Sequence, residues 1–402
     1  MSRLSICQLG DLIEFQRGYD LPKSKFVAGP YPVQSSNGIL GYHNEYKVEA
    51  PGITIGRSGT VGLPHMLEEN FYPHNTALYI KDFKGNDVRY IYYLLKYLKL
   101  GDKKSGSGVP TMNRNHLHPL TINAFRNITD QKSISSVLHL VDQKIELNNR
   151  INAELEAMAK TLYDYWFVQF DFPDANGKPY KASGGKMVYN DTLMREIPDG
   201  WHDGCASEII SFNPTTYLSK GSMAKYIDMD SLPVKGFMTK RPRAKEFAGG
   251  TKFVKNDVAV ARITPCLENG KTALLSRLEE GEVGFGSTEF IILRGKNFPL
   301  FGFASCLSRS ESFRQFAIAN MTGTSGRKRI DAKVLETYSL AIPPKDLLVK
   351  YEETVSSFFK NMTVNSIEND ELSDLRDWLL PMLMNGQVTV KPSTESQEAQ
   401  HG

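Results

Sequence analysis

The chain has 402 residues, of which 41% are hydrophobic and 23% are charged, a composition typical of globular proteins with two or three domains. It contains no run of about 18 apolar residues, and its first residues lack an apolar signal segment. We therefore expect no membrane span and a cytoplasmic location. The four cysteines stand far apart and form no CxxC pair, which favours free thiols over disulfides or a zinc site.

The net charge of +3 is distributed unevenly along the chain. Residues 1–125 carry 14 Lys and Arg against 10 Asp and Glu, and residues 200–343 carry 20 against 14. The segments between and after these regions are neutral or acidic. Two basic regions on a non-basic frame are typical of two modules that face an anion. Lysines that only keep the surface soluble would give the same pattern.

Residues 1–125 are predicted to form a first, mainly β domain. Short apolar runs alternate with Gly, Pro and Asn, as in YPVQSSNGILGY and PGITIGRSGTVG, which indicates short strands joined by turns. A helix, DVRYIYYLLKYLKL, is expected over 87–100. The first domain is therefore expected to be mixed α/β.

A first long helix is predicted over 126–168. Its apolar residues recur every three or four positions, and Thr129 or Asp130 can cap its start. Residues 169–199 contain three prolines and three glycines and are expected to form a linker or arm. Within this arm, ASGGK at 182–186 lacks the spacing of a phosphate loop and is interpreted as a turn.

The second half of the chain has the same texture as the first. Short apolar runs such as VAVARITPCLENGK and GEVGFGSTEFIIL again predict strands, and a long amphipathic stretch again follows them. A second domain is predicted over 200–343, with a helical stretch near 299–319. A second long helix is predicted over 344–382, because Pro381 together with Gly386 ends the helical pattern. Residues 383–402 are expected to form a flexible tail.

An internal repeat relates the two long helices. When the first is shifted by 217 residues, its apolar positions fall on apolar positions of the second, for example Ile134 on Tyr351 and Leu138 on Val355. Asparagines within the apolar stripes coincide as well. Apolar matches alone could arise between any two amphipathic helices, whereas matched polar positions are less expected by chance. The coinciding residues are Asn148 with Asn365 and Asn152 with Asn369.

The order domain, helix, domain, helix predicts an α+β fold. We expect two similar mixed α/β domains separated by two long, antiparallel, coiled-coil-like helices, with a pseudo-two-fold internal repeat. The four asparagines then meet near the middle of the helix pair, where polar residues fix the register at some cost in stability. The alternative is that they face solvent.

No motif for catalysis or cofactor binding is found in the sequence. There is no GxGxxG after a predicted strand, no GxxxxGK[ST] loop and no GxSxG. The histidines at 116 and 118 have no third metal ligand nearby in the sequence. We therefore expect no catalytic residues, no cofactor and no metal.

The loops of both basic domains are rich in side chains that contact nucleic acids. Arginine can donate two hydrogen bonds to guanine and asparagine can bond adenine, while lysine and backbone amides bind phosphates. Composition alone does not separate base contacts from phosphate contacts. The candidate DNA-binding residues are Ser36, Asn37, His43, Arg57, Ser58, Thr60, Lys103, Lys104, Asn113 and Arg114 in the first domain, and Lys240, Arg241, Arg243, Lys245, Arg262, Thr264, Arg327, Lys328 and Arg329 in the second.

The sequence resembles the DNA-specificity subunits of Type I restriction–modification enzymes along nearly its whole length. The resemblance rests on LGDLIEFQRG at the start, on DQKSISSVLHLVDQKIELNNRINAELEAMAKTLYDYWFVQFDFP in the middle, and on GKPYKASGGKMV followed by REIPDGW. The second long helix keeps the helical pattern of the family but few of its residues.

This resemblance implies the function of each part. The two domains would be target-recognition domains that each read one half of a bipartite DNA sequence, and the helices would set the spacer between the halves. Catalysis would reside on partners, namely two adenine methyltransferase subunits and restriction subunits. The absence of [ND]PP[FY] and Walker motifs agrees with this division of labour.

Two other functions are compatible with the residues alone. A self-sufficient methyltransferase or nuclease is one, although the methylation motif is missing. A tandem protein-interaction scaffold without DNA reading is the other, although the basic loops disfavour it. An aromatic segment, WFVQFDF from Trp166, could either dock partners or pack between domain and helix.

Overall fold

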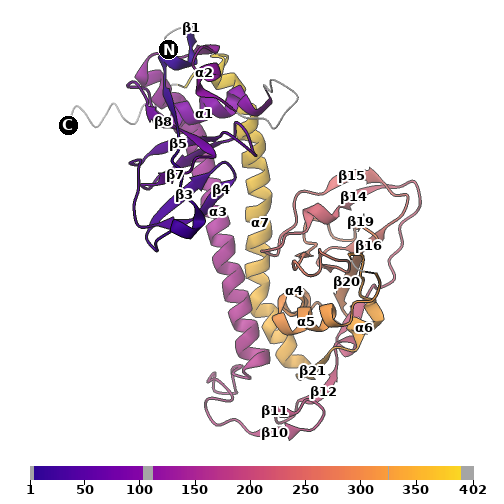
Figure 1. The fold of residues 1–402 in the computed structure, drawn as a ribbon. Coiled ribbons are helices and arrows are strands. Elements are labelled where there is room, and N and C mark those ends of the chain that lie inside the picture. Colours follow the sequence, from indigo (N-terminus) through magenta and orange to yellow (C-terminus); the bar gives the residue numbers. More distant parts are fainter. Residues whose placement is uncertain (1–3, 103–111, 325, 391–402) are drawn as a thin grey trace, which may run out of the picture. The chain divides into compact units, whose positions relative to one another are not determined.

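The computed structural model describes residues 4–102, 112–324 and 326–390 (Figure 1). The chain forms two compact units. The first unit combines Met1–Ile145 with Glu371–Gly402, and the second is Glu146–Asp370. Two long helices, α3 (Ile128–Tyr163) and α7 (Lys345–Met384), each contribute residues to both units. The presence of the two long helices confirms that part of the prediction.

The β-rich part of the first unit contains three sheets. Strand β1 (Ser5–Gln8) pairs with β9 (Thr121–Ala124) in antiparallel register. A four-stranded sheet has the order β2-β8-β5-β6, and a three-stranded sheet has the order β4-β3-β7. Their bounds are β2 Glu14–Arg17, β8 Ala77–Asp82, β5 Gly52–Gly56, β6 Pro64–Leu67, β4 Gly38–His43, β3 Tyr31–Ser35 and β7 Tyr72–Pro73.

Helix α1 (Val88–Leu98) lies within the range that the sequence predicts. Its N-cap, Asp87, accepts a hydrogen bond from the backbone N–H of Tyr90, and the left-handed Lys99 ends it. One face of α1, including Leu94, is buried in the core of the first unit together with Leu383 near the end of α7. A short helix, α2 (Arg114–Leu117), follows the undescribed residues 103–111.

Three sheets of the second unit correspond to the three of the first. Strand β12 (His202–Cys205) pairs with β21 (Ser339–Ile342). Two four-stranded sheets have the orders β13-β20-β17-β18 and β15-β14-β19-β16. Their bounds are β13 Ile210–Phe212, β20 Phe290–Gly295, β17 Val258–Ala261, β18 Thr272–Leu274, β15 Arg243–Glu246, β14 Met223–Ile227, β19 Val283–Gly286 and β16 Thr251–Val254. Its helices are α4 Phe301–Arg309, α5 Glu311–Ala319 and α6 Ala332–Glu336.

The order of strands in the two units follows one scheme. The pair β1-β9 corresponds to β12-β21, and the order β2-β8-β5-β6 corresponds to β13-β20-β17-β18. The predicted strand segments PGITIGRSGTVG and VAVARITPCLENGK supply the equivalent strands β5 and β17, and GEVGFGSTEFIIL supplies β19 and the start of β20. The helical stretch expected near 299–319 is two helices, because Ser310 is extended and caps α5.

The arm over 169–199 is folded onto the second unit. It contains an antiparallel pair, β10 (Met187–Asn190) with β11 (Arg195–Pro198), and it follows a π-helical turn, Asp164–Val168, at the end of α3. The side chains of Trp166 and Phe167 lie in the core of the second unit. Of the two roles open for this aromatic segment, the structure therefore gives it packing.

The second long helix ends two residues beyond the predicted bound of 382 and before Gly386. Helix α7 continues through Pro381 to Met384. Proline removes one backbone hydrogen bond from a helix, but Leu383 and Met384 are almost fully buried in the core of the first unit and hold the last turn in place. Gly386, at a φ of 69°, then ends the helix, since it takes the left-handed conformation at no steric cost.

Within each unit, α3 and α7 run antiparallel. In the first unit, Arg376 of α7 donates to Asp142 of α3 at 2.8 Å. In the second, the hydroxyl of Tyr351, near the start of α7, donates to the carbonyl of Ala159, near the end of α3, at 3.3 Å. The predicted repeat positions Ile134 and Tyr351 are both fully buried.

Candidate nucleic-acid interface

Arg57 stands directly after strand β5 in the first unit, and two backbone hydrogen bonds fix its position. Its N–H donates to the carbonyl of Thr76, just before β8, at 2.9 Å, and its carbonyl accepts from Met112, just before α2, at 2.8 Å. The side chain is half-buried and one guanidinium N–H donates to the carbonyl of Asn75 at 3.5 Å. The backbone of Arg57 is therefore clamped between two other loops.

Arg262 stands directly after β17 in the second unit and has the same backbone frame. Its N–H donates to the carbonyl of Glu289, just before β20, at 2.9 Å, and its carbonyl accepts from Ile330, just before α6, at 3.0 Å. The Nε of Arg262 is buried without a hydrogen-bond partner. Both units thus present an arginine after the corresponding strand, from the same pair of backbone hydrogen bonds.

Other candidate residues of the first unit surround Arg57. The backbone N–H of Thr60 donates to Oδ1 of Asn37 at 3.3 Å, and the N–H of Ser58 donates to Thr76 at 3.2 Å. Ser36 is buried, whereas Asn37 and Thr60 are exposed. The structure therefore brings the loops after β3 and β5 together, and their exposed polar atoms face solvent beside Arg57.

Asn113 and Arg114 open the short helix α2 close to this position. The side chain of Asn113 caps α2 by accepting from the N–H of Asn115 at 3.0 Å. A cavity of about 500 Å³ is lined by cationic and amide side chains from three parts of the chain, together with the carboxylate of Asp20. Its lining includes Arg57, Asn113 and Arg114 with two residues that the sequence reasoning did not select, Arg17 and Tyr19.

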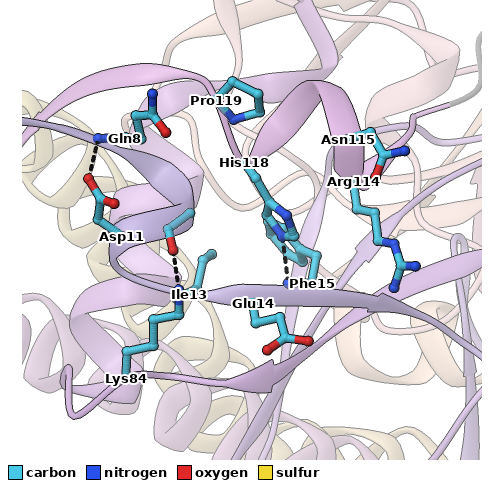
Figure 2. Close-up of a pocket in the computed structure, with 11 residues that line it drawn as sticks. Gln8, Asp11, Ile13, Glu14, Phe15, Lys84, Arg114, Asn115, His118 and Pro119 are labelled. Carbon is cyan, nitrogen blue, oxygen red and sulfur yellow. Dashed lines mark hydrogen bonds between the residues drawn. The ribbon is translucent and has the colours of Figure 1, made fainter.

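A second cavity, of about 580 Å³, shares Arg114 with the first and is drawn in Figure 2. Figure 2 shows Arg114 and His118 at opposite ends of the α2 segment, with the His118 ring next to strand β2. Nε2 of His118 accepts from the backbone N–H of Phe15 at 2.9 Å. Burial, aided by the cations Lys84 and Arg114, lowers the pKa of His118 below its usual value, so the ring is neutral and structural.

The equivalent loops of the second unit are joined by reciprocal hydrogen bonds. The N–H of Thr264 donates to the carbonyl of Lys328 at 3.0 Å, and the N–H of Lys328 donates to Oγ1 of Thr264 at 3.1 Å. Arg329 forks onto the carboxylate of Glu289, with a closest contact of 2.7 Å. The hydrogen bonds from Arg329 hold the pKa of Glu289 below its usual value. Arg327 and Lys328 remain exposed beside Arg262.

Several candidates lie apart from these two clusters. His43 is buried, and its Nδ1 accepts from the N–H of Val27 at 3.1 Å, so its ring belongs to the core. Arg243 pairs with Asp228, and the ammonium of Lys245 lies 4.3 Å from the centre of the Tyr226 ring. The remaining candidates are Lys240, which is exposed, Arg241, which lies 3.6 Å from Asp370, and Lys103 and Lys104, which fall outside the described residues.

The four asparagines of the repeat all make hydrogen bonds between α3 and α7. Nδ2 of Asn148 donates to Oδ1 of Asn369 at 3.0 Å and to Glu368 at 2.7 Å. Nδ2 of Asn365 donates to Oδ1 of Asn152 at 2.9 Å. Asn148 is fully buried and the other three are half-buried. The alternative that these side chains face solvent is therefore wrong.

The described part of the chain offers no group of three or more His, Cys, Asp or Glu side chains placed to hold a metal ion. Among the same residues, no helix has both the length and the apolar character that crossing a membrane requires.

The chain is similar to known proteins of one family. Residues 1–157 match the family model described as Type I restriction modification DNA specificity domain. The chain is 29% identical over 196 residues to the EcoAI specificity subunit of Escherichia coli, which covers 45% of this chain and 31% of that protein. It is 25% identical over 323 residues to the MjaIX specificity subunit of Methanocaldococcus jannaschii, which covers 75% and 69%. The match to the first relative thus spans about a third of that protein.

A solved structure shares the fold. The crystal structure of a Type-I restriction-modification system S subunit from M. genitalium superposes with a TM-score of 0.63 at 16% identity, over 95% of this chain and 96% of that one. This match shows a shared fold, and the family model and the relatives confirm the resemblance that the sequence predicts.

Proposed function

We propose that this chain, a relative of the DNA-specificity subunits of Type I restriction–modification enzymes, is the non-catalytic DNA-reading subunit of such an enzyme. Each unit contributes one target-recognition domain, and each domain reads one half of a bipartite DNA sequence. The observation that carries this proposal is the shared frame of Arg57 and Arg262, each clamped by two backbone hydrogen bonds at the corresponding place of its unit.

The chemistry of the two clusters suits base reading. A guanidinium can donate two hydrogen bonds to O6 and N7 of guanine in the major groove, and the backbone hydrogen bonds of Arg57 and Arg262 fix where each of these side chains starts. The exposed Lys328, Arg327 and Arg114 beside the two arginines can neutralise phosphates. Each cluster thus combines an arginine with a fixed backbone, suited to a base contact, with exposed cationic side chains suited to phosphate contacts.

The long helices would set the gap between the two half-sites. Helix α3 has 36 residues, which corresponds to about 54 Å at 1.5 Å per residue, a length comparable to about one and a half turns of B-DNA. The asparagine hydrogen bonds between α3 and α7 oppose sliding of one helix along the other. A fixed register gives a fixed gap.

The same helices offer surfaces for partner subunits. In the second unit, Leu147, Met158 and Val364 are exposed, and in the first unit Leu375 and Trp378 are exposed. Leu147 and Val364 are equivalent positions of the repeat, and so are Met158 and Leu375. Equivalent apolar positions favour two copies of one partner. We infer that this partner is an adenine methyltransferase subunit, and that restriction subunits join the same complex.

Methylation mapping tests this function. The chain would be co-expressed with the methyltransferase subunit of its own system, and methylated adenines would be located across a plasmid by single-molecule sequencing. We expect one split motif with a single gap length, and no methylation without this chain. A stable complex that neither binds DNA in a gel-shift assay nor methylates any motif would favour the protein-interaction scaffold instead.

A further inference from the structure

The second recognition domain meets helix α7 through a cluster of polar contacts centred on Arg277. This residue lies in the loop after β18, and its side chain is only 6% exposed. One Nη donates to the carbonyl of Ser366 on α7 at 2.7 Å and also contacts the Ser366 hydroxyl. The other Nη forms an ion pair with Asp370, one helical turn further along.

Two neighbouring contacts extend the cluster along the same face of α7. The hydroxyl of Thr363 donates to Oγ of Ser276 at 2.7 Å, and Nε of Arg241 lies 3.6 Å from the carboxylate of Asp370. Thr363, Ser366 and Asp370 are spaced three and four residues apart, so their side chains lie on one face of the helix. The sequence reasoning assigned Arg241 to DNA, whereas the structure gives it a carboxylate on α7.

The apolar contacts at this junction do not define a position as sharply. Phe237 and Phe301 of the domain lie against Phe359 of α7, with ring centres 5.1 Å and 5.8 Å apart. Apolar contact is non-directional, and nearer the start of α7 the carboxylate of Glu352 accepts from the N–H groups of Gly302 and Phe303. The forked guanidinium of Arg277 requires both Ser366 and Asp370 in one geometry. A shift of the domain along α7 would leave this buried charge unpaired.

We propose that Arg277, with Thr363, Ser366 and Asp370, positions the second recognition domain on α7 and thereby selects the gap length of the DNA target. This inference rests on the proposed function, because a gap exists only if both domains read DNA. Arg277 acts through the placement of the domain and contacts no base. One base pair corresponds to about 3.4 Å along the duplex, so a small displacement of the domain along the helix admits a neighbouring gap length.

The test is methylation mapping with variants of the cluster. Arg277→Ala removes all contacts of this side chain, and Arg277→Lys keeps the charge but removes the fork. Asp370→Asn and Thr363→Val each weaken one contact of the cluster. They replace Arg277→Ala in the test if that variant does not fold. Arg294→Ala is the matched control, because Arg294 pairs with buried Asp257 inside the same domain, with contacts of 2.6 Å and 2.7 Å.

We expect methylation at sites with a gap one base pair longer or shorter to rise by about tenfold relative to the original gap, the change that 1.4 kcal/mol produces. The half-site sequences should stay the same. Arg294→Ala should lower methylation at all sites without adding gap lengths. A single unchanged gap in every cluster variant that methylates DNA would overturn the inference, and so would equal broadening by Arg294→Ala. If the unaltered chain gave no split motif, the proposed function itself would fail.

Discussion

Asn152 and Asn365 are bonded to each other across the two long helices, with Nδ2 of Asn365 donating to Oδ1 of Asn152 at 2.9 Å. The second pair, Asn148 with Asn369, lies four residues away on each helix, in the opposite chain direction, as antiparallel helices require. The 217-residue shift matches Asn148 with Asn365 and Asn152 with Asn369, whereas in the structure Asn148 bonds Asn369 and Asn152 bonds Asn365. A pseudo-two-fold axis would map Asn148 onto Asn365 and Asn369 onto Asn152, so it would carry one bonded pair onto the other.

Replacement of Asn148 should destabilise the helix pair. Asn148→Ala would remove the two hydrogen bonds that this fully buried side chain donates to Glu368 and Asn369 across the helix pair. We expect a loss of about 1–3 kcal/mol in the free energy of unfolding, the cost of unsatisfied buried polar groups, measured by urea unfolding. The control is Asn361→Ala on the exposed side of α7, which should change the stability little. Equal effects at both positions would contradict a special role of Asn148.

Replacement of the clamped arginines should remove sequence preference. Arg57→Ala and Arg262→Ala should each cost about 1–3 kcal/mol of discrimination at one half-site, measured by fluorescence anisotropy with cognate and scrambled duplexes. Each variant should affect only its own half-site, because each arginine belongs to a different unit.

Lys328→Ala is the contrasting variant, since Lys328 is exposed beside the Arg262 cluster. It should weaken binding to all duplexes alike and lower the slope of log affinity against log salt concentration by about 1. If Arg57→Ala and Arg262→Ala also weakened binding to cognate and scrambled DNA equally, these arginines would be phosphate contacts and not base readers.

Stability should depend on pH through Glu352. Its buried carboxylate accepts from the N–H groups of Gly302 and Phe303 at 3.1 Å and 2.7 Å, but burial outweighs these bonds and raises the pKa of Glu352 from 4.5 to about 7. Between these values the unfolded chain loses the proton and the folded chain keeps it. Stability should therefore be highest below pH 4.5 with respect to this group and fall by about 3 kcal/mol as the pH rises to about 7.

Glu352→Gln should remove this part of the pH dependence, because the side chain no longer titrates. Urea unfolding of both proteins across this range measures the difference. Glu353→Gln is the matched control, since Glu353 is the exposed neighbour on the same helix. An unchanged pH profile in Glu352→Gln would show that this carboxyl is ionised throughout.

Cys306 should resist alkylation in the native protein. Its thiol is 3% exposed, and burial raises its pKa to about 12, so little of the reactive thiolate is accessible. Iodoacetamide labelling followed by peptide mass spectrometry should modify Cys7, Cys205 and Cys266, which are half-buried, before Cys306. Labelling of Cys306 should appear when urea unfolds the second unit. Rapid native labelling of Cys306 would contradict the packing around α4.

The long helices and the arginine loops could be predicted because their signals are local. The spacing of Ile134 and Leu138 defines a helix face without knowledge of the rest of the fold, and GRSGT follows a strand pattern in plain sequence. Arg17 and Tyr19 could not be placed, because they reach Arg57 only through the pairing of β2 with β8 and of β8 with β5. Pairings between distant strands leave no trace in a single sequence.

The same reason explains the candidates that lie elsewhere. His43 looks like a surface residue in SSNGILGYHN, yet its ring packs near Phe26 and Tyr72. Arg243 belongs to the basic run TKRPRAK, yet it pairs with Asp228. The acidic partner is fifteen residues away in the sequence and becomes a neighbour only when β14 and β15 pair. A basic run therefore overstates the charge that a surface offers to DNA.

The two units also differ in whether they are continuous in the sequence. The second unit is one continuous stretch, Glu146–Asp370, whereas the first needs residues from both sides of that stretch. During synthesis the ribosome delivers the whole second unit before it delivers Leu383 and Met384, which fill the core of the first. The part that begins to emerge first is thus the last to be completed, and a nascent chain that stops after Asp370 holds one finished unit and one with an open core.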